Sequence, residues 1–198
     1  YLWENHTRYI GWDEFYKLID NNPANHDSSK TNALISEGLL MCRDFYDGSE
    51  VVGITYDMLS GYVIANYLFQ KYKEDLPKFI KSKEAFDKLF SNDYSKHHPQ
   101  FEDIRESFTA LLPQKIGKHF YEILPKSKRY NLVLDLAYET IFKVSSKFIT
   151  QKEIKFITSC LEIPENREYT FRLAKHLFCS TENPFNIKYW TEFLKKLT

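Results

Sequence analysis

The stretch VVGITYDMLSGYVIANYLFQKYK, residues 51–73, decides how this chain folds. It begins as a short strand over residues 51–56 and turns into a long helix at Asp57. We expect Asp57 to be the N-cap of that helix, because its carboxylate can accept a hydrogen bond from an amide of the first turn. The stretch therefore predicts a junction between strand and helix at Tyr56 and Asp57.

The helix predicted for residues 57–73 is apolar over most of its surface. One face carries apolar residues at steps of four and three, namely Met58, Tyr62, Ala65, Phe69 and Tyr72. Four further apolar residues widen that face, namely Leu59, Val63, Ile64 and Leu68. A helix that is apolar nearly all round is covered on several sides, so we expect neighbouring segments to pack onto it.

The residues before this stretch predict two helices and a second strand. The first helix spans residues 9–20, and the second is capped by Ser28 or Ser29 and stopped by Gly38. A strand at residues 39–42 follows, and Asp47-Gly48 is typical of a two-residue hairpin turn. The order helix, helix, strand, turn, strand and helix predicts a winged-helix domain over residues 1–75.

Beyond Glu74 the periodicity is helical throughout. The expected helices span residues 78–90, 101–112, 114–124, 130–148, 151–161 and 165–178, with a last apolar stripe from Ile187 to Leu197. Prolines and short polar loops separate them, and Pro113 is expected to end one of them. We therefore predict a mainly α fold in which an α-helical repeat, solenoid-like region covers residues 76–198, although no fixed repeat period is found.

Composition limits the classes of function. The chain has 198 residues, of which 43% are hydrophobic, and its 27 basic residues balance its 27 acidic ones, so no overall field attracts nucleic acid or anionic lipid. The three cysteines lie far apart, which indicates reduced thiols and a cytoplasmic location. The absence of a membrane-length apolar run predicts no membrane partner. A first residue other than methionine suggests a piece of a longer chain.

Motifs for catalysis and metal binding are missing from the sequence. Gly48 and Gly53 have the glycine spacing of a phosphate loop, but the lysine that follows such a loop is replaced by Ile54. His176 and Cys179 are three residues apart, but two ligands do not make a metal site. The pair His97-His98 lies in a polar loop, and we expect it to be solvated. No catalytic residue and no metal site is therefore predicted.

A winged helix suggests DNA binding, but the charge of this one disfavours it. Residues 28–56 contain two basic and four acidic residues, a net charge of −2. A surface of this sign cannot release counterions from DNA phosphates. We therefore expect DNA to be an unlikely partner.

Three motifs in order resemble the bacterial antiphage STAND NTPases, the Avs proteins. Thr55-Tyr56-Asp57 is similar to the end of their winged-helix strand, where related proteins have His-Asp or His-Glu. The segment LLPQKIG, residues 111–117, resembles an element after their winged helix, with Gln114 in place of an acid. The segment NPFN, residues 183–186, resembles a later element, with Asn183 in place of a histidine.

The resemblance implies a function and a site. It implies that Tyr56 and Asp57 sense the nucleotide, since the equivalent histidine of these proteins contacts the β-phosphate of ADP. It also implies a parent that binds ATP or ADP with Mg²⁺ in an upstream ATPase domain, recognises a viral protein and forms a homo-oligomer. From the residues alone, the alternative interpretation of Tyr56 is a core aromatic packed beneath the helix.

Two other functions remain open at this point. One is a helical-repeat scaffold for protein–protein contact that has no link to nucleotide. The other is a winged-helix DNA-binding regulator, which the charge makes the weaker alternative. A phosphate loop upstream in the same gene would favour the STAND ATPase over both.

Overall fold

A computed structural model describes residues 1–20, 29–124 and 135–136, together with the single positions 155, 159, 163 and 168. The fold is mainly helical, with a small three-stranded antiparallel sheet. The chain divides into two compact units, Tyr1–Phe108 and Thr109–Thr198. The first unit includes residues on both sides of the predicted division at residue 75, which itself stays a prediction.

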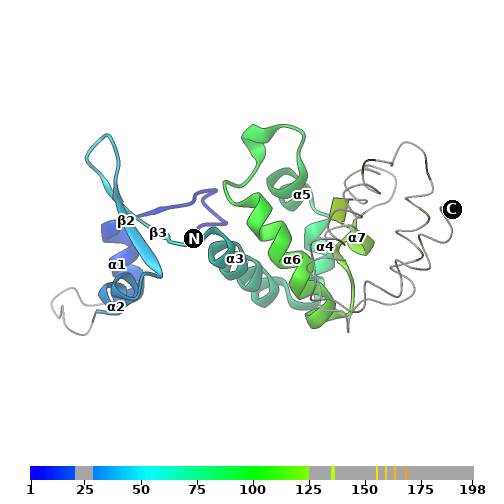
Figure 1. The fold of residues 1–198 in the computed structure, drawn as a ribbon, viewed down its shortest axis with the longest axis horizontal. Helices are drawn as coiled ribbons and strands as arrows, with labels where there is room; N and C mark the ends of the chain where they lie inside the picture. Colours follow the sequence, from blue (N-terminus) through cyan, green and yellow to red (C-terminus); the bar gives the residue numbers. More distant parts are fainter. Residues whose placement is uncertain are drawn as a thin grey trace. The chain divides into compact units, whose positions relative to one another are not determined.

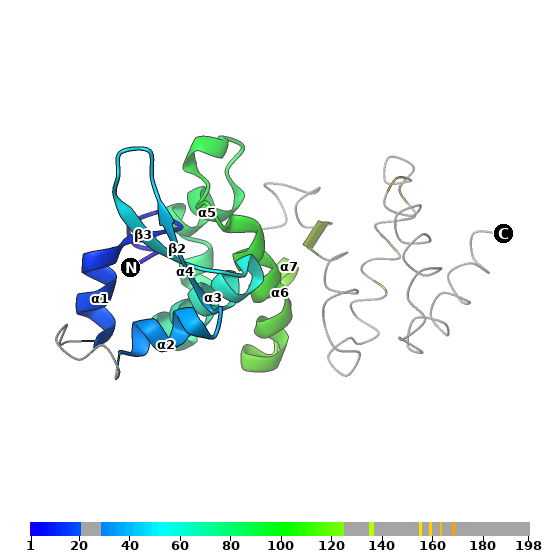
Figure 2. The same ribbon diagram turned by 60° about the vertical axis from the view of Figure 1, so that its left-hand side comes forward.

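The elements follow one another as Figures 1 and 2 show. In order they are β1 (Ile10–Gly11), α1 (Trp12–Asp20), α2 (Lys30–Ser36), β2 (Leu40–Asp44), β3 (Glu50–Ile54), α3 (Asp57–Tyr72), the 3-10 turn η2 (Lys73–Asp75), α4 (Leu76–Ile80), α5 (Lys83–Phe90), the 3-10 turn η3 (Tyr94–Lys96), α6 (Phe101–Ile116) and α7 (Phe120–Ile123). The predicted long helix after Asp57 is therefore confirmed to within one residue.

The sheet has the order β1-β3-β2, with both pairs antiparallel. Ile10 pairs with Val52, and Leu40 pairs with Ile54. The expected start of the first helix at residue 9 is wrong, because Ile10 and Gly11 form β1 and α1 begins at Trp12. Two residues are too few to show a strand period, and Ile10 joins the sheet only through its partner in β3. Ile10, Leu40 and Val52 form the buried core of the sheet.

The hairpin between β2 and β3 is present, but its turn is longer than predicted. The Phe45 amide donates to the Ser49 carbonyl at 2.9 Å, and the Gly48 amide donates to the Phe45 carbonyl at 2.9 Å. Gly48 has a φ of +80°, which favours glycine at this position. The expected two-residue turn at Asp47-Gly48 is therefore wrong, and the loop follows the three-residue pattern in which the last residue is left-handed.

Helix α2 begins and ends where the sequence predicts. The Ser29 hydroxyl accepts a hydrogen bond from the Asn32 amide at 3.0 Å, and the helix ends before Gly38, which has a φ of +70°. Asp20, the last residue of α1, accepts from the Ser29 hydroxyl at 2.9 Å and from the Lys30 amide at 2.6 Å. Asp20 at the end of α1 thus forms hydrogen bonds with the first residues of α2.

The predicted buried face of α3 is confirmed in the second half of the helix, at Ala65 and Phe69, and is wrong in the first half. Met58 and Tyr62 are exposed, whereas the buried residues of the helix are Ser60, Gly61, Ile64, Ala65, Leu68 and Phe69. At Gly61 the backbone of Asp103 in α6 comes so close that a Cβ atom on the glycine would lie 2.4 Å from the Asp103 carbonyl carbon. Small residues therefore define the contact, and the first half of α3 leaves its large apolar side chains exposed.

Three of the helices predicted after α3 have different bounds in the structure. The helix expected over residues 78–90 is divided into α4 and α5, because Ser82 caps a new helix by accepting from the Ala85 amide at 3.3 Å. Helix α6 continues through Pro113 to Ile116, and Gly117 follows with a φ of +64°. The helix expected over residues 114–124 is reduced to the short α7.

The remaining helices predicted beyond residue 124, including the capping box at residues 150–153, lie outside the described residues apart from isolated positions. Across the described residues, no helical repeat or solenoid is shown. The helices of that same part of the chain are all too short or too polar to cross a membrane.

Candidate functional site

Tyr56 lies between the end of β3 and the first turn of α3. Its backbone is extended, with φ −104° and ψ 124°, and it occupies the N-cap position of the helix. The side chain is 61% exposed, so the interpretation of Tyr56 as an aromatic packed beneath the helix is wrong. A role for Tyr56 in sensing nucleotide stays a prediction.

Asp57 is the first residue of α3 and not its N-cap, which corrects the expected capping role. Its carboxylate forms an ion pair with the guanidinium of Arg8, from the segment before β1. An acid in the first turn is favoured by the positive end of the helix dipole, but the pair is partly exposed and contributes at most about 1 kcal/mol. The junction thus presents an exposed tyrosine beside a partly exposed ion pair.

The hairpin next to this junction is acidic on its surface. Asp44, Asp47 and Glu50 are exposed. The basic residue that precedes them in β2, Arg43, is held against Tyr9, with its Nη1 donating to the Tyr9 hydroxyl at 3.3 Å. This arrangement offers no basic surface for a DNA backbone.

A second site lies where the N-terminal segment, residues 1–7, packs onto the helices that follow the sheet. The segment forms its own turn, in which the Asn5 amide donates to the Tyr1 carbonyl at 2.9 Å and the Thr7 amide donates to the Leu2 carbonyl at 3.1 Å. The turn closes at His6, which has a φ of +53°. This turn directs Trp3 into the protein, where the side chain is only 1% exposed.

Aromatic rings hold Trp3 on two sides. Its ring makes an edge contact with Phe79 of α4, with centroids 6.0 Å apart and an interplanar angle of 69°. It stacks on His98 with centroids 5.6 Å apart and an angle of 19°. Phe79 in turn stacks on Tyr72 at the end of α3, at 3.8 Å. Each such aromatic pair adds about 0.5–1.5 kcal/mol beyond the area that it buries.

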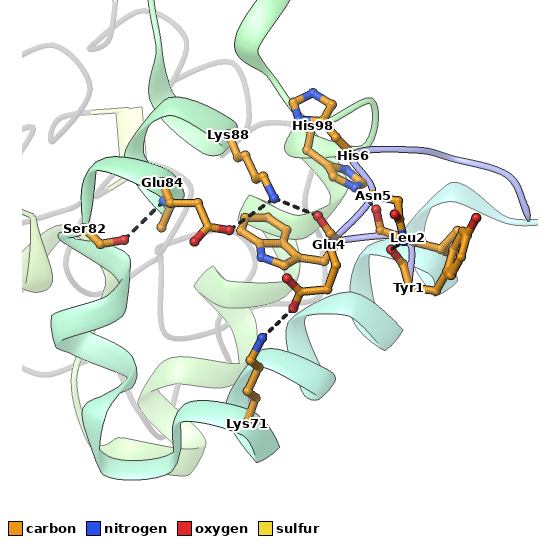
Figure 3. Close-up of polar contacts among 12 residues, drawn as sticks. Tyr1, Leu2, Glu4, Asn5, His6, Lys71, Ser82, Glu84, Lys88 and His98 are labelled. Carbon is orange, nitrogen blue, oxygen red and sulfur yellow. Dashed lines mark hydrogen bonds and ion pairs between the residues drawn. The ribbon is translucent and has the colours of Figure 1, made fainter.

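Lys88 of α5 holds both the ring and the backbone of Trp3 (Figure 3). Its Nζ lies 4.6 Å from the centroid of the Trp3 ring and donates to the Trp3 carbonyl at 2.8 Å. The same Nζ lies 3.2 Å from Glu84 Oε1, one helical turn earlier. A cation over an indole face that is shielded from water contributes about 2 kcal/mol.

Glu4 ties the segment to α3 (Figure 3). Its Oε1 lies 2.5 Å from Lys71 Nζ and accepts from the Tyr67 hydroxyl at 3.0 Å. The hydrogen bond with Lys71 lowers the pKa of Glu4 and raises the pKa of Lys71. The charges are thus complementary, although their exposure limits the pair to about 1 kcal/mol.

His98 is fully buried, which corrects the expectation that His97-His98 is solvated. Its Nδ1 accepts from the Gln100 amide at 3.1 Å and is therefore unprotonated, so Nε2 carries the proton and donates to the Leu2 carbonyl at 3.0 Å. Burial lowers the pKa of His98 to about 4. His97 is half-buried, and its carbonyl accepts from His6 Nε2 at 2.6 Å.

The sequence analysis missed this second site. Its residues come from the N-terminal segment, α3, α4, α5 and the turn before α6, and no spacing in the sequence links them. The one available signal was a tryptophan followed by an acid in a segment without helical or strand periodicity. Such a pattern does not indicate which other segments of the chain the tryptophan and the acid contact.

The described part of the chain contains no candidate metal-binding site. Among those residues, no group of three or more His, Cys, Asp or Glu side chains could hold a metal ion. Cys42 is a free, exposed thiol, and burial of part of it raises its pKa. His176, Cys160 and Cys179 lie outside the described residues.

Comparisons of this chain with protein families, with characterised proteins and with solved structures found no match.

Proposed function

We propose that this chain is the regulatory and sensor segment of a STAND-type ATPase in antiviral, antiphage defence. In this proposal a winged-helix domain over residues 1–75 reads the nucleotide state of an upstream ATPase domain, which holds ATP or ADP with Mg²⁺. A helical-repeat region over residues 76–198 contributes to recognition of a viral protein, and recognition leads to a homo-oligomer of the parent. The proposal rests on the resemblance carried by residues 55–57, 111–117 and 183–186.

The observation that best supports the proposal is the exposure of Tyr56. A residue that contacts a nucleotide on a neighbouring domain has to be reachable from outside its own domain. Tyr56 is exposed at the end of β3, next to Asp57 and Arg8. A tyrosine hydroxyl can donate one hydrogen bond to a phosphate, although it carries no charge at neutral pH.

The order of elements also supports the winged-helix part. Two helices, α1 and α2, precede the hairpin of β2 and β3, and α3 follows it. The added strand β1 pairs with β3 and completes a three-stranded sheet. A winged-helix domain with an acidic hairpin is suited to contact with protein in place of DNA.

The experiment that tests the proposal uses the intact parent protein. The gene is first read upstream of Tyr1 for a phosphate loop and an acidic magnesium-binding strand. Purified parent carrying Tyr56→Phe is then compared with wild type for retained ADP, with Tyr46→Phe, a fully exposed hairpin tyrosine, as the matched control. Loss of one neutral hydrogen bond should weaken ADP retention by roughly 3- to 10-fold, and unchanged retention contradicts the role of Tyr56.

The alternative is a scaffold for protein–protein contact with no nucleotide link. It is favoured by the large apolar side chains that the first unit leaves exposed, among them Tyr46, Met58 and Tyr62. Tyrosine is enriched at protein interfaces because it combines apolar area with a polar end. A parent gene without a phosphate loop would favour this alternative. The lower alternative, a DNA-binding regulator, requires duplex binding that weakens steeply with salt.

A further inference from the structure

The surface that holds Trp3 is filled by a short segment of this chain, residues 1–7. We call it the Trp3 groove and define it by the side chains that contact Trp3 and Glu4, namely Tyr67, Lys71, Phe79, Lys88 and His98. The N-terminal segment reaches this groove from a part of the sequence at least 63 residues away.

Residues 1–7 contact this surface through one buried side chain, that of Trp3, and through a few polar contacts. Within residues 1–7, all of which the structure describes, Trp3 alone is classed as buried. Two main-chain carbonyls, of Leu2 and Trp3, accept from His98 and Lys88, and the Glu4 carboxylate meets Lys71. These contacts involve an aromatic residue followed by an acid, while Tyr1 and His6 make further contacts with Glu14 and with the His97 carbonyl.

Two features of residues 1–7 are energetically unfavourable in the docked position. The Trp3 Nε1 donor is buried and has no hydrogen-bond partner among the described residues, which opposes docking. His6 adopts a positive φ, which costs free energy for a residue other than glycine. A segment that is bound with an orphan donor and a strained residue is open to competition from a peptide that avoids both.

We infer that the Trp3 groove is a recognition site for a partner peptide with an aromatic residue directly followed by Asp or Glu, and that residues 1–7 occupy it in cis until such a peptide displaces them. The aromatic residue takes the place of the Trp3 ring between Phe79, His98 and Lys88. The acid takes the place of Glu4 beside Lys71. This inference is independent of the proposed ATPase function, because it concerns no nucleotide and no residue of the β3–α3 junction.

The test measures binding of a fluorescent peptide to the full chain by fluorescence polarisation. The peptide is YLWENHT, the sequence of residues 1–7, acetylated at its N-terminus and labelled at its C-terminus. The chain carrying Trp3→Ala keeps the groove but loses the competing anchor, so we expect it to bind the peptide at least 10-fold more tightly than wild type. The control peptide YLAENHT should not bind either chain, and equal binding of the two peptides overturns the inference.

A charge exchange tests whether the acid is recognised at Lys71. Trp3→Ala is combined with Lys71→Glu, and the peptide YLWKNHT is compared with YLWENHT. The preference between the two peptides should reverse relative to the chain with Trp3→Ala alone. A preference that does not change overturns the assignment of the acid to Lys71.

Two further outcomes are decisive. If the chain with Trp3→Ala does not fold, as judged by circular dichroism, Glu4→Lys is used, because Glu4 is exposed and its replacement leaves no cavity. Peptide binding to that chain no tighter than to wild type overturns the inference. A wild-type dimer that depends on concentration and is lost with Glu4→Lys identifies the occupant as a second copy of this chain, and this also overturns it.

Discussion

The ammonium group of Lys88 lies over the ring of Trp3, 4.6 Å from its centroid, and donates a hydrogen bond to the Trp3 carbonyl at 2.8 Å. One side chain of α5 thus holds both the aromatic anchor and the backbone of a segment 85 residues earlier in the chain. The two interactions reinforce each other, because the same ammonium position satisfies both. They make Lys88 the residue on which docking of residues 1–7 depends most directly.

Replacing Lys88 by methionine tests this dependence. Lys88→Met keeps the length of the side chain and removes the charge, so we expect the free energy of unfolding to fall by about 1–3 kcal/mol. The control is Lys96→Met, since Lys96 is exposed and its pairing with Asp93 is a surface ion pair. The control should lie within about 0.5 kcal/mol of wild type in urea unfolding. Equal effects of the two substitutions would contradict the structural role of Lys88.

Trp3→Ala should lower the free energy of unfolding by less than the burial of the Trp3 side chain suggests. A tryptophan truncated in a rigid core costs about 3–5 kcal/mol. Trp3→Ala is expected to lower the free energy of unfolding by only about 1–2 kcal/mol, because the whole segment can detach and the loss is limited to its docking free energy. Urea unfolding measures the change, with Tyr46→Ala as the exposed control. A loss above about 3 kcal/mol would show that the segment cannot be displaced.

Docking of the segment should weaken in mild acid because of His98. Its pKa is about 4 when it is buried against Leu2 and near 6.5 when it is free in water. The free state therefore binds more protons between these two values, so docking is strongest above pH 6.5 and is lost as the pH falls toward 4. The loss over this interval amounts to up to about 3 kcal/mol.

The indole NMR signal of Trp3 measures that loss. We expect it to move from its buried to its solvated position with a midpoint near pH 5, as His98 becomes charged beside Lys88 and His6. His98→Gln provides the control, because an amide can keep the hydrogen bond to the Leu2 carbonyl without titrating in this range. A signal that is constant from pH 7.5 to 4.5 in the wild type would refute the assignment of His98 as the neutral donor.

The close approach of α3 and α6 predicts the effect of a small substitution. In Gly61→Ala the new Cβ would meet the backbone of Asp103 at 2.4 Å, so the two helices must move apart. We expect a loss of about 1–3 kcal/mol in the free energy of unfolding, despite the higher helix propensity of alanine. Gly11→Ala is the control, because its Cβ would meet no atom within 4 Å. A stabilising effect of Gly61→Ala would contradict the observed helix crossing.

The local signals in the sequence were sufficient for several elements. Ser29 and Gly38 delimit α2, and the apolar run after Tyr56 forms the 16-residue helix α3. Caps, left-handed glycines and long runs of helical period act within a few residues of one another, so they can be read without tertiary contacts. The exposed side chain of Tyr56 and its place as the N-cap residue ahead of Asp57 were not among them, since both depend on how the chain enters the helix.

Other features were decided only by the tertiary structure. Strand β1 exists because Ile10 meets Val52, and the buried face of α3 extends to Ser60 and Gly61 because α6 approaches at Gly61. Hydrophobic periodicity favours large side chains and gives no weight to the small residues that allow two backbones to meet. The sequence by itself therefore determined α2, α3 and the two strands of the hairpin, whose signals are local. Tertiary contact decided which faces are buried, and it brought Trp3 to Lys88 and His98, because those contacts join residues that no local rule relates.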